Sequence, residues 1–298
     1  MTLVAVLIAN PARPAITDAV LAETRRVLAT PHQPRILHGE VAAEVMLAGD
    51  PADAPALADR LRAALGDEPV DVAVLPADSH RRKRLFLADM DSTMIEQECI
   101  DELADQVGLK AHVAAITERA MRGEIAFEPA LRERVALLKD LPVGAIGRLI
   151  AERITLTPGG RTLVRTMRAH GAHTCLVSGG FTLFTGPVGE KLGFDENRAN
   201  RLTLAGERLA GTVEEPIVGK VAKRETLIEL RGRFGLAPAE TLAVGDGAND
   251  LDMLGEAGLG VAFRAKPAVA AAAQVRIEHG DLTALLYLQG YAAAEFVG

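Results

Sequence analysis

The sequence predicts an α/β protein with a Rossmann-like parallel sheet, a helical cap inserted after the first strand of that sheet, and a small βαββαβ domain in front of it. From residue 85 onward, short apolar runs alternate with helical patterns, which is typical of a parallel sheet with helices on both faces. The segment at about 97–157 is mostly helical in pattern and too long for one crossover helix. Before residue 79 the elements follow another order, so we expect two domains.

The first domain is expected to span residues 1–78. Short apolar runs that end at breakers favour strands, and amphipathic stretches favour helices. Asp50 fits the N-cap of the second helix, with Pro51 at its first position. The expected elements are a strand at 3–9, a helix at 14–29, two strands within 34–48 around Gly39, a helix at 51–65 and a strand at 70–75. This order predicts a ferredoxin-like fold.

A short basic segment, residues 79–84, joins the two predicted domains. Its four consecutive basic residues also fit a localisation signal or a nucleic-acid-binding patch. The whole chain, however, carries a formal net charge of −7, which argues against a general binder of nucleic acids or anionic membranes. We therefore interpret the segment as a solvated basic linker.

The second domain is expected over residues 85–298, and the end of each strand directs attention to a site. Ligands of such sheets bind outside the carboxyl ends of the strands. A cap inserted after the first strand would exclude water from a site there. The expected strands are 85–88, 173–177, 241–244, 258–263 and 275–278.

Composition narrows the class of protein. Of 298 residues, 49% are hydrophobic and 24% charged, which is ordinary for a folded globular protein. Aromatic residues are scarce at 3%, which disfavours stacking platforms for single-stranded nucleic acid. The two cysteines, Cys99 and Cys175, cannot form a disulfide framework or a Cys-rich zinc site. The first residues lack a basic signal-peptide region and no apolar run approaches 18 residues, so a cytoplasmic protein is expected.

Polar residues follow the first two strands of the predicted sheet. Asp89 and Asp91 come directly after the first strand, where two carboxylates would repel each other unless a cation binds them. Ser178 and Gly179 follow the second strand, where a hydroxyl and free N–H groups could receive an anion. Taken alone, the second pattern reads as a tight turn between a strand and a helix.

A third group follows the strand at 241–244. Asp246, Asn249 and Asp250 lie there within a glycine-containing turn. An Asx-rich turn is the ordinary explanation, but Asp246 together with Asp89 could supply the oxygen ligands that Mg²⁺ prefers. Lys223, which opens a helical run before this strand, reads alone as a solvent-exposed lysine and gains interest only as the missing positive charge.

Together these residues resemble the motifs of the haloacid dehalogenase superfamily of phosphohydrolases. Within that superfamily, residues of about 85–290 are most similar to the phosphoserine phosphatases, and the first domain resembles an ACT-type module. The matching segments are Asp89 to Ile95 with Glu98 and residues 100–104, Met121 to Phe127 with residues 131–135, Ser178-Gly179, Lys223, and Gly245 to Asp250.

The resemblance implies hydrolysis through a phospho-aspartate intermediate, with Asp89 as nucleophile, Asp91 as general acid and base, and Lys223 as the catalytic cation. The implied cofactor is Mg²⁺, with Asp89, the backbone carbonyl of Asp91, and Asp246 as its ligands. The implied substrate-binding residues are Glu98, Arg134, Ser178, Gly179, Lys223 and Asn249. The implied supporting residues are Thr93 and Asp250.

Two of these residues belong to the cap, and their pattern alone does not single them out. A helix near 124–140 would carry Phe127, Leu131, Val135 and Leu138 on one apolar stripe. Arg134 borders that stripe, where an arginine often extends to solvent. The residues around Glu98 do not show on which face of a helix it would lie. Without the resemblance, both read as surface charges.

The implied function is hydrolysis of O-phosphoserine to serine and phosphate, the last step of serine biosynthesis. Two alternatives remain open: phosphoryl transfer to or from another small amino-acid alcohol such as homoserine, and a regulatory amino-acid-binding protein. The site motifs are intact, which favours an enzyme. Phosphoserine is the expected small-molecule partner, with no nucleic acid or membrane. The order of the first domain adds a hypothesis of serine binding or a homodimer, although a fold does not by itself imply a function.

Overall fold

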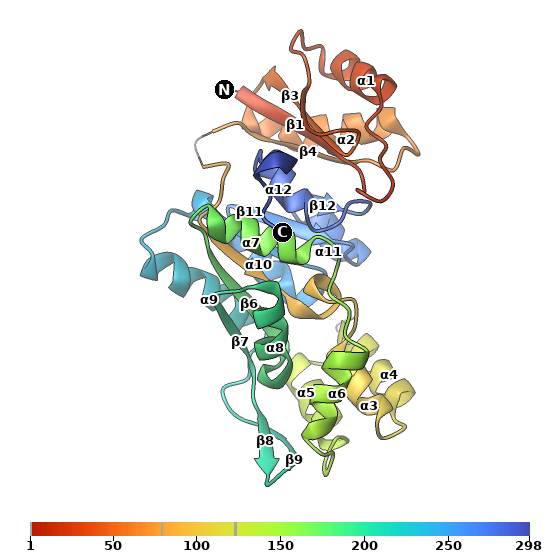
Figure 1. Ribbon diagram of the computed structural model, residues 1–298, viewed down its shortest axis with the longest axis vertical. Helices are drawn as coiled ribbons and strands as arrows, with labels where there is room; N and C mark the ends of the chain where they lie inside the picture. The colour runs from red at the N-terminus through yellow and green to blue at the C-terminus, as the bar shows by residue number, and fades with distance from the viewer. Residues whose placement is uncertain (1, 79, 122–123) are drawn as a thin grey trace.

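The structure is a computed structural model that describes residues 2–78, 80–121 and 124–298. Its long axis carries three parts: an antiparallel sheet at the N-terminus, a central parallel sheet between helices, and a group of helices beside a β-hairpin (Figure 1). Met1, Ser79, Arg122 and Gly123, which belong to the predicted first domain, the linker and the cap motif, lie outside the described residues.

The N-terminal sheet has four antiparallel strands in the order β2-β3-β1-β4, the ferredoxin-like arrangement that the sequence predicts. Side chains alternate along β1: Leu3 and Leu7 pack against α1 and α2, whereas Val4 and Val6 face the central part of the molecule. The elements are β1 (Thr2–Ile8), α1 (Asp18–Leu28), β2 (Arg35–His38), β3 (Ala42–Ala48), α2 (Ala54–Leu65) and β4 (Asp71–Pro76).

Both helices of this part begin later than predicted, because caps intervene. The Thr17 hydroxyl accepts the N–H of Val20 at 3.3 Å, so α1 begins at Asp18 rather than at residue 14. The Asp50 carboxylate accepts the N–H of Ala52 at 2.9 Å and caps a short 3-10 turn that precedes α2.

The central sheet has six parallel strands in the order β12-β11-β10-β5-β6-β7. Leu85 and Leu87 of β5 pack in the same cluster as residues of α9 and α10, and Phe86 and Ala88 in the same cluster as residues of α7 and α8. The two sides of the sheet are therefore both covered, as predicted. The elements are β5 (Leu85–Ala88), α7 (Gly160–Ala169), β6 (His173–Phe181), α8 (Thr182–Leu192), β7 (Glu196–Asn200), α9 (Lys220–Arg233), β10 (Thr241–Gly245), α10 (Leu251–Glu256), β11 (Leu259–Phe263), α11 (Pro267–Ala272), β12 (Val275–Ile277) and α12 (Ala284–Leu288).

The described residues of the cap form four helices between β5 and α7: α3 (Cys99–Asp105), α4 (Lys110–Met121), α5 (Phe127–Ala136) and α6 (Gly144–Glu152). A hairpin that the sequence did not predict, β8 (Leu202–Ala205) and β9 (Arg208–Val213), lies beside it (Figure 1). The N–H of Asp140 donates to the carbonyl of Leu209, and the N–H of Leu209 donates to the carbonyl of Leu141, both at 2.9 Å. The central part thus contacts the cap through backbone bonds as well as through the chain connections.

The basic linker is less solvated than predicted. Arg81 is largely buried: its guanidinium lies 2.6 Å from the carboxylate of Glu44 in β3 and donates to the carbonyls of Tyr287 and Leu288 at 3.2 and 2.9 Å. The burial of Arg81 follows from this bridge between the N-terminal sheet and the C-terminal segment. Among the described helices, none is both long and apolar enough to cross a membrane.

Candidate active site

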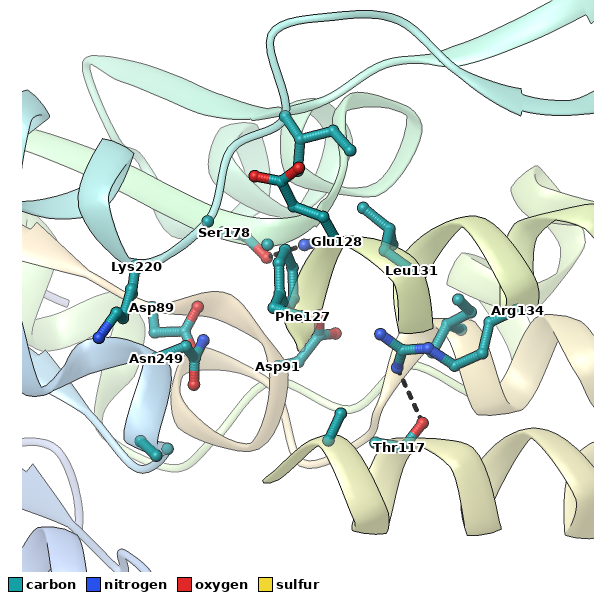
Figure 2. A pocket seen from close by; sticks show the side chains of 18 of the residues that line it. Asp89, Asp91, Thr117, Phe127, Glu128, Leu131, Arg134, Ser178, Lys220 and Asn249 are labelled. Carbon is teal, nitrogen blue, oxygen red and sulfur yellow. Dashed lines mark hydrogen bonds between the residues drawn. The ribbon is translucent and has the colours of Figure 1, made fainter. Parts of the chain in front are cut away.

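The carboxyl ends of three neighbouring strands meet beneath the cap. Ala88 of β5 pairs with Val244 of β10 on one side and with Leu176 of β6 on the other. The polar residues that follow these strands consequently line one cavity of about 680 Å³, together with cap residues (Figure 2). As predicted, the first, second and third groups of strand-end residues come together.

Three carboxylates and one lysine form a buried cluster at the cavity, which Asp89 and Asp246 line directly. Carboxylate oxygens of Asp89, Asp246 and Asp250 lie within 4.8 Å of one another, and all three residues are buried. The Nζ of Lys223 lies 2.6 Å from Asp89 Oδ1 and 2.7 Å from Asp250 Oδ1. Lys223 is fully buried in α9, so the solvent-exposed interpretation that its sequence alone suggested is wrong.

The charges of this cluster are unbalanced. Burial, and next the charge of Asp250, raise the pKa of Asp89 well above its usual value, although Lys223 opposes them. Burial and Asp250 also raise the pKa of Asp246 to about 6. Burial lowers the pKa of Lys223, but Asp250 and Asp89 outweigh it and the net shift is upward. Ionisation of all three carboxylates beside one ammonium would leave two negative charges uncompensated, and a divalent cation with oxygen ligands would remove that deficit.

One side-chain donor and one backbone donor hold two of the acidic residues in place. Thr93 donates its hydroxyl to Asp246 Oδ1 at 2.9 Å. Asp91 Oδ1 accepts the N–H of Cys99, the first residue of α3, at 3.0 Å, and burial raises the pKa of Asp91. A Cβ at Gly180 would lie 2.9 Å from Asp91 Oδ2, so a side chain there would displace this carboxylate.

The segment after the core of β6 forms another wall. Ser178 is buried, and its Oγ accepts the N–H of Gly180 at 2.8 Å. Ser178, Gly179 and Asn249 all line the cavity. The strand is four residues longer than predicted, and these four residues carry the serine and both glycines.

Glu98 and Arg134 line the cap side of the same cavity, so the surface positions that their pattern suggested are wrong. The Arg134 side chain is 6% exposed; its Nε donates to the carbonyl of Ala130 at 3.0 Å and its Nη1 to Thr117 Oγ1 at 2.8 Å (Figure 2). Burial lowers the pKa of Arg134, against the opposing charge of Asp101.

Glu98 is held by a neighbour from the strand-end turn. Its Oε1 accepts the Ser92 hydroxyl at 2.7 Å. Burial, and next the charge of Asp91, raise the pKa of Glu98 to about 8. A carboxyl group in this state becomes anionic readily only when a positive group comes close.

The sequence gives no sign of the roles of Ser92, Cys99 and Thr117, which orient Glu98, Asp91 and Arg134 respectively. Each contact joins residues from different elements. Thr117, for example, lies on α4 and meets α5 only when the cap helices pack. The sequence carries no periodic or motif signal for such a contact.

Fold and site together define a Rossmann-like α/β protein with a capped acidic centre at the carboxyl ends of its strands. The profile of the haloacid dehalogenase-like hydrolases matches residues 86–255, more than half of the chain. The chain therefore belongs to the haloacid dehalogenase-like hydrolase family.

Relatives within this family are phosphoserine phosphatases. The chain is 46% identical over 210 residues to the phosphoserine phosphatase of Polaromonas sp., covering 69% of this chain and 89% of that protein. It is 45% identical over 234 residues to that of Streptomyces coelicolor, covering 78% of this chain but 56% of that longer protein. A solved phosphoserine phosphatase described as a phospho-aspartyl intermediate analogue is 41% identical, with a TM-score of 0.65 over 69% of this chain and 98% of the other.

Proposed function

We propose that this chain hydrolyses O-phosphoserine to serine and phosphate, with Mg²⁺, as the last step of serine biosynthesis. The observation that carries the proposal is that Glu98 and Arg134 line the same cavity as Asp89, whose carboxylate is paired with the buried Lys223. A carboxyl group and a guanidinium opposite an acidic, lysine-containing centre match the ammonium, the carboxylate and the phosphate of phosphoserine. The names of the relatives support the same substrate.

Asp89 is the proposed nucleophile. Its carboxylate attacks phosphorus, an O–P bond forms, and the bond between phosphorus and the serine oxygen breaks, so one difficult hydrolysis becomes two easier steps. Asp91 gives a proton to the departing serine oxygen. In the second step Asp91 takes a proton from the water that attacks the phospho-aspartate. The raised pKa of Asp91 favours the protonated form that the first step needs.

The other residues of the cavity hold the phosphoryl group. Lys223 offers a compact positive charge, and Ser178, Gly179 and Asn249 offer neutral polar groups. Asp89, Asp246 and the backbone carbonyl of Asp91 would hold Mg²⁺, which when bound supplies charge neutralisation and orientation for an in-line displacement. Thr93 and Asp250 support Asp246 and Lys223 through the bonds described above.

The direct test is phosphate release with Mg²⁺ from phosphoserine, phosphoethanolamine and phosphoglycolate. Wild type should prefer phosphoserine, because each of the other esters lacks one charged group. Glu98→Gln and Arg134→Lys should reduce that preference, and Asp89→Asn should abolish release of phosphate. Activity on other esters but not on phosphoserine would discard the substrate and keep the chemistry. Inactivity on every ester would favour the regulatory alternative.

The transfer alternative requires its own assay. Wild type supplied with phosphoserine and homoserine forms phosphohomoserine only if homoserine can replace water in the second step. We expect phosphate and serine in equal amounts and no phosphohomoserine. Formation of phosphohomoserine at a rate comparable to hydrolysis would identify a phosphotransferase instead.

We also propose a division into an ACT-like domain at 1–78, a linker at 79–84 and a cytoplasmic phosphatase domain at 85–298 with its cap at about 97–157. Serine binding or dimerisation through the first domain stays a hypothesis from its βαββαβ order. Serine titration calorimetry and sedimentation of the intact chain test it. Removing residues 1–78 would instead expose apolar side chains of the central part that share a core cluster with Val4 and Val6, among them Tyr287. A monomer that binds no serine would end the hypothesis.

A further inference from the structure

We propose that Asn200 is a positioning residue, which joins the phosphate-binding segment at the carboxyl end of β6 to the segment that begins α9 and so fixes the surface on which Phe127 of the cap rests. The inference rests on the proposed function, because it assigns a phosphate site to these segments. Asn200 is the last residue of β7, an edge strand that the sequence did not predict.

The Asn200 amide directs three hydrogen bonds at two backbone segments. Its Nδ2 donates to the carbonyl of Gly179 at 2.8 Å and to the carbonyl of Val218 at 3.2 Å. Its Oδ1 accepts the N–H of Val218 at 2.7 Å. The side chain is 1% exposed, so no solvent competes for these bonds. Both amide donors and the acceptor are used, which makes Asn200 a fixed cross-link.

The hydrogen bond from Asn200 to the carbonyl of Gly179 acts on the phosphate-binding segment. The peptide unit between Gly179 and Gly180 is held at its carbonyl by Asn200 and at its N–H by Ser178 Oγ, at 2.8 Å each. Rotation of this peptide unit would break both bonds. Asn200 therefore controls the orientation of the Ser178 hydroxyl through one rigid peptide plane.

The other two bonds act on the segment that begins α9. Val218 is fixed at both its N–H and its carbonyl, and the next residue, Gly219, accepts the N–H of Lys223 at 3.1 Å in the first turn of the helix. Asn200 thus sets Lys223 relative to Ser178. These two side chains are proposed to hold the same phosphoryl group, so their separation matters for binding it.

Phe127 of the cap contacts both joined segments. A Cβ at Gly179 would lie 3.0 Å from Phe127 Cζ, and a Cβ at Gly219 would lie 3.3 Å from Phe127 Cδ1. Figure 2 shows the ring between the core residues Asp89 and Asn249 and the cap residue Arg134. Asn200 holds Gly179 directly and Gly219 through its neighbour Val218, so the two glycines form a seat without side chains for the aromatic ring. A side chain at either glycine would press on the ring of Phe127.

The first experiment measures binding of inorganic phosphate with Mg²⁺ by titration calorimetry, for wild type and Asn200→Asp. The substitution keeps an acceptor for the Val218 N–H but turns a carboxylate oxygen toward two carbonyls. We expect Kd to weaken about tenfold. A merely structural role would lower the binding stoichiometry, because fewer molecules are folded, and leave Kd unchanged. Asn197→Asp is the matched control: Asn197 lies on the same strand but accepts from Thr185 of α8.

The second experiment leaves Asn200 intact and tests the seat. Gly219→Ala should raise KM for phosphoserine, and Phe127→Leu in the same chain should restore part of the loss, so that the two changes are not additive. This pair decides the question even if Asn200→Asp does not fold. An unchanged phosphate Kd in folded Asn200→Asp, or strict additivity of Gly219→Ala and Phe127→Leu, would overturn the inference. A wild type that binds phosphate but releases none from phosphoserine would overturn the proposed function and leave this inference standing.

Discussion

At the scale of single residues, the acidic centre depends on one buried cation. Lys223 lies between Asp89 and Asp250, at 2.6 and 2.7 Å, in a place where water cannot screen their repulsion. The same arrangement that stabilises the fold without a metal also keeps a positive charge beside Asp89, where the proposed function places the phosphoryl group.

Lys223→Met should therefore lower the free energy of unfolding by about 3–5 kcal/mol in chelator-treated protein, because two buried carboxylates lose their partner. Lys220→Met is the matched control. Lys220 lies on the same helix, is 60% exposed and stands 3.8 Å from Asp252, so its loss should cost no more than about 1 kcal/mol. Urea titrations of both variants give the comparison; equal costs would contradict the structural role given to Lys223.

A second prediction concerns Glu98, whose pKa is raised by burial from 4.5 to about 8. Between these values the folded state holds a proton that the unfolded state releases, so the contribution of Glu98 to stability falls as pH rises, by at most about 1.4 kcal/mol per pH unit. Glu98→Gln removes this term. The free energies of unfolding of wild type and Glu98→Gln should be measured without Mg²⁺ from pH 5 to 8. As pH rises, the difference between them should change in favour of the variant. Parallel curves would refute the shift.

The sequence predicts the acidic residues of the site better than the two charged residues of the cap. Asp89 and Asp246 were expected together from their positions after parallel strands, because the carboxyl ends of neighbouring strands meet at one edge. Glu98 and Arg134 entered only through family resemblance. Their burial depends on how α4 and α5 pack, and on partners such as Thr117 that no local pattern identifies.

At the scale of elements, apolar runs located the central strands well. The edge strand β7 was missed, since its sequence Glu-Asn-Arg-Ala-Asn contains almost no apolar side chains. The hairpin β8–β9 was missed as well, and it is the element that braces the cap. Its strands are short and partly exposed, with no continuous apolar face that a sequence pattern would reveal.

Gly211 of β9 provides a test of this brace. Its φ is +82°, and a Cβ there would lie 3.0 Å from the Cβ of Lys139 in the cap. Gly211→Ala should cost about 1–3 kcal/mol more than Gly206→Ala, because Gly206 has a similar φ of +62° but open space around it. Hydrogen exchange should also speed up at residues 140–143 in the first variant alone. Equal costs and unchanged exchange would show that the hairpin does not brace the cap.

At the scale of the whole molecule, the N-terminal sheet is part of one continuous apolar core. Val4, Val6 and Ile8 pack in the same cluster as residues of α12, among them Tyr287. Asp71 of β4 strengthens the junction, since its carboxylate accepts the N–H groups of Glu278 and Gly280 at 2.8 and 2.7 Å. The sequence predicted the folds of both parts but not the contact between them. The face of the N-terminal sheet that makes this contact has the same apolar pattern as a face buried inside its own domain.

Asp71→Ala should lower the free energy of unfolding by about 1–3 kcal/mol, because backbone donors lose their acceptor. The exposed Asp59→Ala, from the ion pair with Arg62 on α2, should change it little. Both proteins should unfold in one cooperative transition by calorimetry and circular dichroism. Two separate transitions in wild type would contradict a shared core.

The central claim is that Asp89 carries the phosphoryl group during hydrolysis of phosphoserine. Wild type mixed with phosphoserine and Mg²⁺, quenched in acid within one turnover and digested, should yield the peptide around Asp89 with one added phosphoryl group by mass spectrometry. Asp89→Asn should yield no phosphorylated peptide. Asp91→Asn should release less phosphate, the product of the second step. A phosphoryl group on another residue, or rapid hydrolysis with Asp89 never modified, would contradict the account.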